Sequence, residues 1–206
     1  MTRRILLAGA ICALVAVAAV AAIHWYSHGP ELEGEVDRLV SLTQTRPGMA
    51  VAEIGAGQGD MAVRVARRLG ASGRLSATEI EAEKLSAIRS AAVAAGLANV
   101  TVLPAGEHSA NLPDACCDVI YMRRVYHHLT DAAAIDKSLH AALRPGGRLA
   151  VIDLLTPRWT LLPSHGIAPD AVIAQLTSAG FTLDRRVDRW SLIDYCLVFR
   201  KAARKL

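Results

Sequence analysis

Three glycines at alternate positions follow a short apolar run and an acidic residue in the stretch VAEIGAGQGD, residues 51–60. Glycine tolerates left-handed backbone and carries no side chain, so such a turn can approach a ligand closely. The spacing G-x-G-x-G, followed by Asp60, differs from the G-x-G-x-x-G of dinucleotide-binding turns, and the phosphate-binding G-x-x-x-x-G-K-[ST] is absent. The pattern therefore favours a nucleoside ligand other than NAD or ATP.

An acidic residue supports this interpretation. Glu79 lies twenty residues after Gly59, at the end of the predicted strand GRLSAT. A carboxylate there can accept hydrogen bonds from both hydroxyls of a ribose. The glycine turn alone could merely bend the chain, but the turn and Glu79 within one strand–helix–strand unit predict a nucleoside site.

The elements that must position these residues alternate along the chain. Apolar runs predict strands at residues 49–54, 73–79, 99–103, 118–122 and 148–153, and helically spaced apolar residues predict helices between them. Asp60 is expected to cap the first of these helices, and RPGG to precede the fifth strand. The alternation predicts an α/β, doubly wound, Rossmann-like fold with a parallel sheet. No helix is expected between the runs FTLDRRV and DYCLVFR, which predicts an antiparallel hairpin at one edge.

Four segments in order, VAEIGAGQGD, ATEI, DVIYMRRVYHHL and LRPGGRLAVID, resemble the class I S-adenosylmethionine-dependent methyltransferase family over roughly residues 46–200. The resemblance is to a bacterial small-molecule branch, some of whose members are exported or membrane-anchored. It implies a seven-stranded sheet with an antiparallel last strand, and the cofactor S-adenosyl-L-methionine. The cofactor-binding residues that it implies are Glu53, Gly55, Ala56, Gly57, Gly59, Glu79, Ile80 and Glu107. Glu53 and the glycines would hold the methionine end, Glu79 the ribose, and Glu107 the adenine amino group.

The methyl acceptor should lie near the end of the fourth strand, where VYHHL follows. His127 and His128 could take a proton from a hydroxyl or thiol acceptor, because histidine titrates near neutral pH. Alternatively, one packs into the domain while the other caps the helix that begins near Asp131. The residues expected to contact the acceptor are Tyr126, Arg123, Asp153 and His165. Tyr126 could instead be a core tyrosine, Arg123 and Arg124 could be solvated, and His165 could be structural, since Gly166 stands where related sequences tend to have a basic residue.

Composition limits the function classes. The 206 residues allow one ordinary domain with a short extension, and the formal net charge is +4 with scattered Arg and Lys, which disfavours nucleic-acid binding. Cys12, Cys116, Cys117 and Cys196 have neither a metal-ligand nor a disulfide-framework spacing, so no metal site is predicted. The adjacent Cys116 and Cys117 are expected at a strand edge as small apolar residues.

Residues 1–28 are expected to be a membrane anchor or a signal segment, followed by the methyltransferase domain at 29–206. No charge interrupts Ile5–Ile23, a nineteen-residue run that as a helix spans about 30 Å of hydrocarbon. We expect an uncleaved single-pass anchor, although Ala19 and Ala21 also allow a cleavage site that would release a secreted or periplasmic protein. The two N-terminal arginines place the domain outside the cytoplasm, whereas S-adenosylmethionine is made inside it, so the side of the membrane stays open.

The expected activity is methyl transfer to a small-molecule or membrane-associated, lipid-like acceptor. Two alternatives come from other function classes. A non-catalytic membrane protein that binds S-adenosylmethionine would need the same turn and Glu79. An NAD-linked oxidoreductase is disfavoured by Asp60 and by RPGG. The oligomeric state is not predicted.

Overall fold

The computed structural model describes residues 31–155 and 166–203. The predicted anchor and His165 lie outside these ranges. Within them, no helix has both the length and the apolar character that a membrane crossing requires. The chain divides into two compact units, residues 1–38 and 39–206. The division falls, in the sequence, within a helix over residues 31–43.

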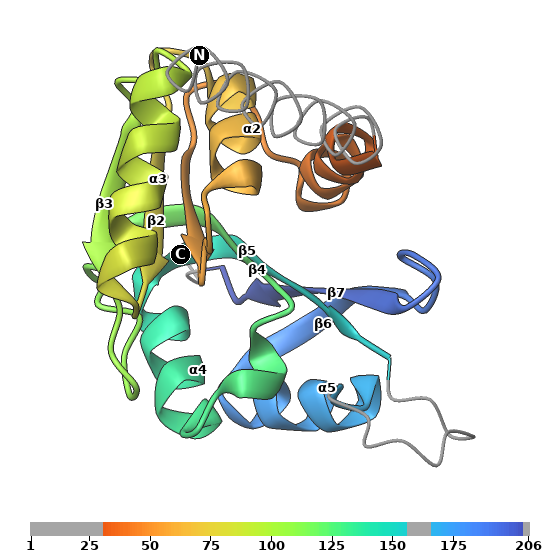
Figure 1. Ribbon diagram of the computed structural model, residues 1–206. Helices are drawn as coiled ribbons and strands as arrows, with labels where there is room; N and C mark the ends of the chain where they lie inside the picture. Colours follow the sequence, from red (N-terminus) through yellow and green to blue (C-terminus); the bar gives the residue numbers. More distant parts are fainter. Residues whose placement is uncertain (1–30, 156–165, 204–206) are drawn as a thin grey trace, which may run out of the picture. The chain divides into compact units, whose positions relative to one another are not determined.

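One seven-stranded sheet organises the second unit (Figure 1), with the strand order β3-β2-β1-β4-β5-β7-β6. The strands are β1 (Ala50–Ile54), β2 (Arg74–Glu79), β3 (Val100–Pro104), β4 (Cys117–Arg123), β5 (Leu143–Leu154), β6 (Phe181–Val187) and β7 (Asp194–Lys201). β7 runs antiparallel to both of its neighbours, β5 and β6, while the other pairs are parallel. The predicted seven-stranded sheet with an antiparallel last strand is confirmed.

Helices cover both faces of the sheet (Figure 1). They are α2 (Asp60–Leu69), α3 (Ala82–Ala94), α4 (Ala132–Ala142) and α5 (Pro169–Ser178), with a short 3-10 turn, η1 (Tyr126–His128). α2 and α3 contact each other on one side, and α4 and α5 contact each other on the other side. Because the central strands are covered on both faces, β4, β5 and β7 carry nearly continuous buried runs.

Two local expectations differ from the structure. The N-cap of α2 is Gly59, which has a left-handed backbone with φ 87°. Asp60 is the first residue of the helix, and no side chain caps it, so the prediction that Asp60 is the cap is wrong. β5 begins at Leu143 rather than at Arg148, because the RPGG segment stays extended. Its pairing with β4 jumps from Cys117↔Leu143 to Val119↔Arg148, so the extra residues form an irregularity in the ladder.

The strand order reverses direction between β1 and β4. In a doubly wound sheet, ligands bind beyond the carboxyl ends of the strands at this point. The loops after β1, β2 and β4 meet there, and they contain the glycine turn, Glu79 and the segment after Arg123.

Candidate active site

A cleft of about 520 Å³ lies at the carboxyl ends of β1, β2 and β4. Its walls come from the glycine turn, the start of α3, the loop after β3 and the segment after β4. The residues singled out from the sequence that line it are Gly55, Gly57, Glu79, Ile80, Arg123 and His128. The structure therefore brings together residues from three separate loops. Of the cofactor-binding residues that the resemblance implied, Gly55, Gly57, Glu79 and Ile80 line the cleft.

The glycine turn is anchored to β2 by main-chain hydrogen bonds. The Gly55 and Ala56 amides both donate to the Thr78 carbonyl, at 2.9 and 3.0 Å. At Gly57, with φ 56°, an added Cβ would meet no atom within 4 Å. Gly57 thus presents bare backbone to open space in the cleft wall, where a ligand can approach the main chain.

Two other residues of the turn serve packing. Ala56 is buried and does not line the cleft; its carbonyl accepts a hydrogen bond from the Gly59 amide at 2.9 Å. A Cβ on Gly59 would lie 3.2 Å from the Ile88 Cα, so Gly59 allows the turn to pack closely against α3. Ala56 and Gly59 therefore shape the turn from behind.

The Glu79 carboxylate is held in the cleft wall by two backbone amides. Oε2 accepts a hydrogen bond from the Gly57 amide at 2.9 Å, and Oε1 accepts one from the Ile80 amide at 2.8 Å. A carboxylate has about four acceptor positions, so ribose hydroxyls can still donate to it. The next residue, Ile80, is 60% exposed and gives the cleft an apolar surface suited to a flat ring.

Glu53 lies inside the sheet and outside the cleft lining. Its Oε2 accepts a hydrogen bond from the Tyr121 hydroxyl at 2.9 Å, across the β1–β4 pair. Burial raises the pKa of Glu53 to about 8, although the Tyr121 hydrogen bond and the charge of Arg123 act to lower it. Near neutral pH this carboxyl is therefore largely protonated, and it supports the turn from within.

Glu107 is exposed and does not line the cleft. The Gly106 amide donates to the Ser109 carbonyl at 2.8 Å, closing a tight turn that leaves residues 107 and 108 in solvent. Gly106 and Ser109 line the cleft in its place. A contact between Glu107 and an adenine amino group would need this loop to move.

The two adjacent histidines have different environments. His127 Nδ1 lies 2.5 Å from Oδ1 of Asp153, whose side chain is fully buried, and the His127 amide donates to Oδ2 at 3.2 Å. Neither residue lines the cleft. His128 is exposed, lines the cleft, and lies against the His127 ring with centroids 3.9 Å apart. Asp153 thus fixes His127, and His127 in turn supports His128.

Tyr126 is buried in the core. Its hydroxyl donates to Asp136 Oδ2 at 2.7 Å and lies 3.0 Å from Gln175 Oε1. Burial raises the pKa of Asp136 to about 6, against the lowering effect of the Tyr126 hydrogen bond. The position matches the alternative of a core tyrosine, and it keeps Tyr126 away from an acceptor in the cleft.

An ion pair that the sequence did not suggest fixes the β4 side of the cleft. Arg124 Nε and Nη2 donate to the two carboxylate oxygens of Asp194, at 2.9 and 2.8 Å. Burial acts to raise the pKa of Asp194, but hydrogen bonds from Arg124 and Ser191 lower it below its ordinary value. The Asp194 side chain is 1% exposed and that of Arg124 is 37% exposed, so a buried carboxylate holds a guanidinium at the cleft surface.

The charges of the cleft are divided between two walls. Glu79 and Glu81 lie on the β2 side, where Glu81 pairs with Lys84 at 2.6 Å. Arg123 and Arg124 lie on the β4 side. One wall therefore suits neutral hydroxyl donors, and the other suits an anionic group.

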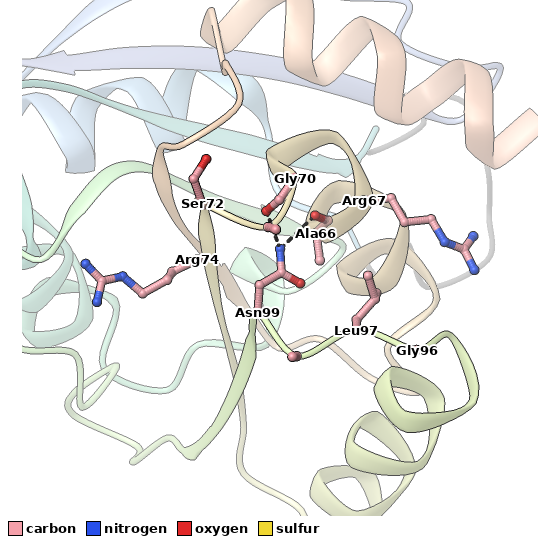
Figure 2. Close-up of a pocket in the computed structure, with 11 residues that line it drawn as sticks. Ala66, Arg67, Gly70, Ser72, Arg74, Gly96, Leu97 and Asn99 are labelled. Carbon is pink, nitrogen blue, oxygen red and sulfur yellow. Dashed lines mark hydrogen bonds between the residues drawn. The ribbon is translucent and has the colours of Figure 1, made fainter.

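A second hollow, of about 620 Å³, lies at the opposite ends of β2 and β3. Figure 2 shows the Asn99 amide nitrogen bonded to the carbonyls of Ala66 and Gly70, while Arg67 and Arg74 point away in different directions. Asn99 thus closes the carbonyl end of α2. Because no charged groups converge there and the hollow is at the amino ends of the strands, its size does not make it the site.

Residues 51–147 match a family model described as "Methyltransferase domain". Residues 51–147 form a methyltransferase domain. The cofactor of this domain is S-adenosyl-L-methionine, in agreement with its fold. A solved S-adenosylmethionine-dependent methyltransferase from Aquifex aeolicus superposes with a TM-score of 0.74 at 23% identity, covering 80% of this chain and 88% of that one.

Curated relatives of the domain have a stated activity. Over 124 residues the chain is 27% identical to "Ubiquinone/menaquinone biosynthesis C-methyltransferase UbiE" of Shewanella frigidimarina, covering 60% of this chain and 49% of the relative. The protein of the same name from Teredinibacter turnerae is 30% identical over 137 residues, covering 64% and 55%. The chain thus spans about half the length of the curated relatives that it matches.

The residues present fit S-adenosyl-L-methionine. Glu79 offers acceptors for ribose hydroxyls, Ile80 offers an apolar surface for the base, and Gly57 leaves open space beside the main chain. The lining of the cleft is therefore compatible with this cofactor.

Proposed function

We propose that the protein transfers a methyl group from S-adenosyl-L-methionine to a small acceptor that carries an acidic oxygen near the methylated atom. The observation that supports this most directly is the division of the cleft, with Glu79 on one wall and the Arg124–Asp194 pair on the other. The first wall suits the cofactor's sugar. The second suits an enolate or phenolate oxygen of the acceptor.

When bound, the cofactor supplies an electrophilic methyl group on a sulfonium sulfur. The chain contributes orientation, since holding the acceptor in line lowers the barrier without a covalent intermediate. Arg124, fixed by two hydrogen bonds to Asp194, stabilises negative charge on the acceptor oxygen. His128, supported by the His127–Asp153 pair, takes the acceptor's proton.

The relatives named as quinone-biosynthesis C-methyltransferases favour a ring acceptor methylated on carbon. A ring hydroxyl that loses its proton makes the neighbouring ring carbon nucleophilic, and this is the role that Arg124 and His128 would serve together. We extend the proposal to an acceptor of this chemistry, whether soluble or membrane-associated.

Cofactor binding is tested first, by calorimetry of the full chain with S-adenosylhomocysteine. Gly57→Ala places a methyl group in the cleft, and it should weaken binding at least tenfold. Gly70→Ala is the matched control, because Gly70 also has a positive φ, 67°, with no atom within 4 Å of an added Cβ. Gly70 lines the second hollow, so weakened binding in Gly70→Ala alone would assign the ligand to that hollow instead.

Turnover is tested with S-adenosylmethionine labelled on the methyl group and a total extract of lipids and metabolites. We expect label in an acceptor, and at least a tenfold lower rate with His128→Gln while cofactor affinity stays unchanged. His108→Gln is the control, since His108 is exposed, pairs with Asp131 and does not line the cleft. Tight binding with no labelled product would favour the non-catalytic binding protein.

For the N-terminal segment we propose a membrane anchor over Ile5–Ile23, which would keep the domain near lipid-soluble acceptors. Full-length chain should remain in the membrane pellet after alkaline extraction, while a chain lacking residues 1–28 should not. Protease treatment of spheroplasts would assign the side of the membrane. Recovery of the full chain in the alkaline supernatant would exclude an anchor.

A further inference from the structure

Two neighbouring thiols lie at the amino end of β4, at the other end of the strand from the cleft. Cys116 Sγ and Cys117 Sγ are 2.8 Å apart, and both cysteines are free. Cys117 is 2% exposed and packs in the core, while Cys116 is half-buried and reachable from solvent. The two sulfurs are thus already in contact, and one of them is accessible.

A left-handed residue precedes the pair, and Arg144 bonds to the residues on either side of it. Ala115 has a left-handed backbone, with φ 48°, and its carbonyl accepts a hydrogen bond from Arg144 Nε at 3.2 Å. Arg144 Nη1 also donates to Asp118 Oδ1 at 2.6 Å. Arg144 therefore holds both ends of the cysteine pair and places a positive charge beside it.

We propose that Cys116 and Cys117 are a site of thiol oxidation, at which a low-molecular-weight disulfide converts the pair into a disulfide between neighbouring residues. The pair is separate from the cleft and independent of the methyl-transfer proposal. The proposal assigns a redox reaction to Cys116 and Cys117, whereas the sequence indicated only small apolar residues.

The reaction is two successive thiol–disulfide exchanges. The Cys116 thiolate attacks one sulfur of glutathione disulfide, forming a mixed disulfide and releasing one glutathione thiolate. Cys117 then attacks the Cys116 sulfur, releasing the second glutathione, and its proton passes to that leaving thiolate. Two protein thiols are oxidised and one glutathione disulfide is reduced to two glutathione molecules. Burial and the contact with Cys116 raise the pKa of Cys117, so the accessible Cys116 makes the first attack.

Geometry makes the product easy to reduce. Neighbouring Cα atoms are about 3.8 Å apart across a trans peptide, whereas disulfides usually join Cα atoms about 4.4–6.8 Å apart. A disulfide between Cys116 and Cys117 is therefore strained, and strained disulfides have more oxidising potentials. The pair should oxidise under a disulfide excess and return readily to thiols.

The test is peptide mass mapping of the folded full chain after incubation with glutathione disulfide. Trypsin releases residues 90–123, which contain Cys116 and Cys117 and no other cysteine. This peptide should lose the mass of two hydrogens, and reduced glutathione should restore it. The peptide of the fully buried Cys196 should stay unmodified.

Two variants separate the steps. Cys117→Ala should retain one glutathione on Cys116, because no second thiol completes the exchange. Cys116→Ser should show no change in the peptide, because Cys117 is buried. A wild-type peptide that keeps a glutathione, or that stays unmodified, overturns the proposal. The wild-type peptide is decisive by itself if either variant fails to fold.

Discussion

At the scale of single residues, two buried acidic side chains on the neighbouring strands β1 and β2 have different surroundings. Glu53 is surrounded by protein and bonded to Tyr121, whereas Glu79 is held at the cleft surface by two amides. We therefore expect Glu53 to affect the stability of the sheet, and Glu79 to affect ligand affinity. Variants of each should separate these effects.

The free energy of unfolding should depend on Glu53 through pH. Its folded pKa of about 8 lies above the ordinary 4.5, so the folded state keeps a proton that the unfolded state loses. Stability should fall between pH 5 and 8 by up to about 4 kcal/mol, at about 1.4 kcal/mol per unit. Glu53→Gln keeps the acceptor for Tyr121 and should remove this fall. Urea unfolding of the wild type and of Glu53→Gln at pH 5, 6.5 and 8 measures this difference. If the free energy of unfolding of both proteins falls equally with pH, the prediction is contradicted.

Tyr126 should contribute to stability and leave cofactor binding unchanged. Tyr126→Phe removes the hydrogen bond to the buried Asp136 and should lower the free energy of unfolding by about 1–3 kcal/mol. It should also raise the pKa of Asp136 further. Calorimetry with S-adenosylhomocysteine should give an unchanged affinity; a marked loss would return Tyr126 to the ligand site.

At the scale of elements, the Arg124–Asp194 pair joins the end of β4 to the start of β7. Asp194→Asn leaves Arg124 without its carboxylate and should destabilise the protein by about 1–3 kcal/mol, since the aspartate is buried although the arginine is partly exposed. The pair of Arg186 with the exposed Asp170 is a matched control, and Asp170→Asn should cost less than about 1 kcal/mol. If Asp194→Asn and Asp170→Asn lower the free energy of unfolding equally in urea, the stability of the protein does not depend on the Arg124–Asp194 contact.

At the scale of the whole molecule, cofactor binding and folding are linked. S-adenosylhomocysteine at a hundred times its Kd should stabilise the fold by about 2.7 kcal/mol and raise Tm. Glu79→Gln should reduce this Tm shift, because it replaces a charged acceptor of the ribose hydroxyls by a neutral amide. Glu83→Gln is the control, since Glu83 is exposed on α3 and does not line the cleft. Equal shifts in both variants would argue against a role for Glu79.

The sequence by itself determined the doubly wound sheet, the antiparallel last strand, the glycine turn and the position of Glu79. These features follow from local periodicity and from residues close to one another in the chain, and strand ends in a parallel sheet meet at one edge whatever the packing. Gly57 and Glu79 could be placed together for this reason.

Only the tertiary structure decided which side chains reach the cleft. Arg124 and Asp194 are 70 positions apart, and no spacing rule joins them. Glu53, Tyr126 and Asp153 lie beside or within the same motifs, yet packing against other strands and helices buries them. Side-chain direction at the end of a strand depends on sheet twist and on neighbours distant in sequence, and these are set only when the whole domain packs.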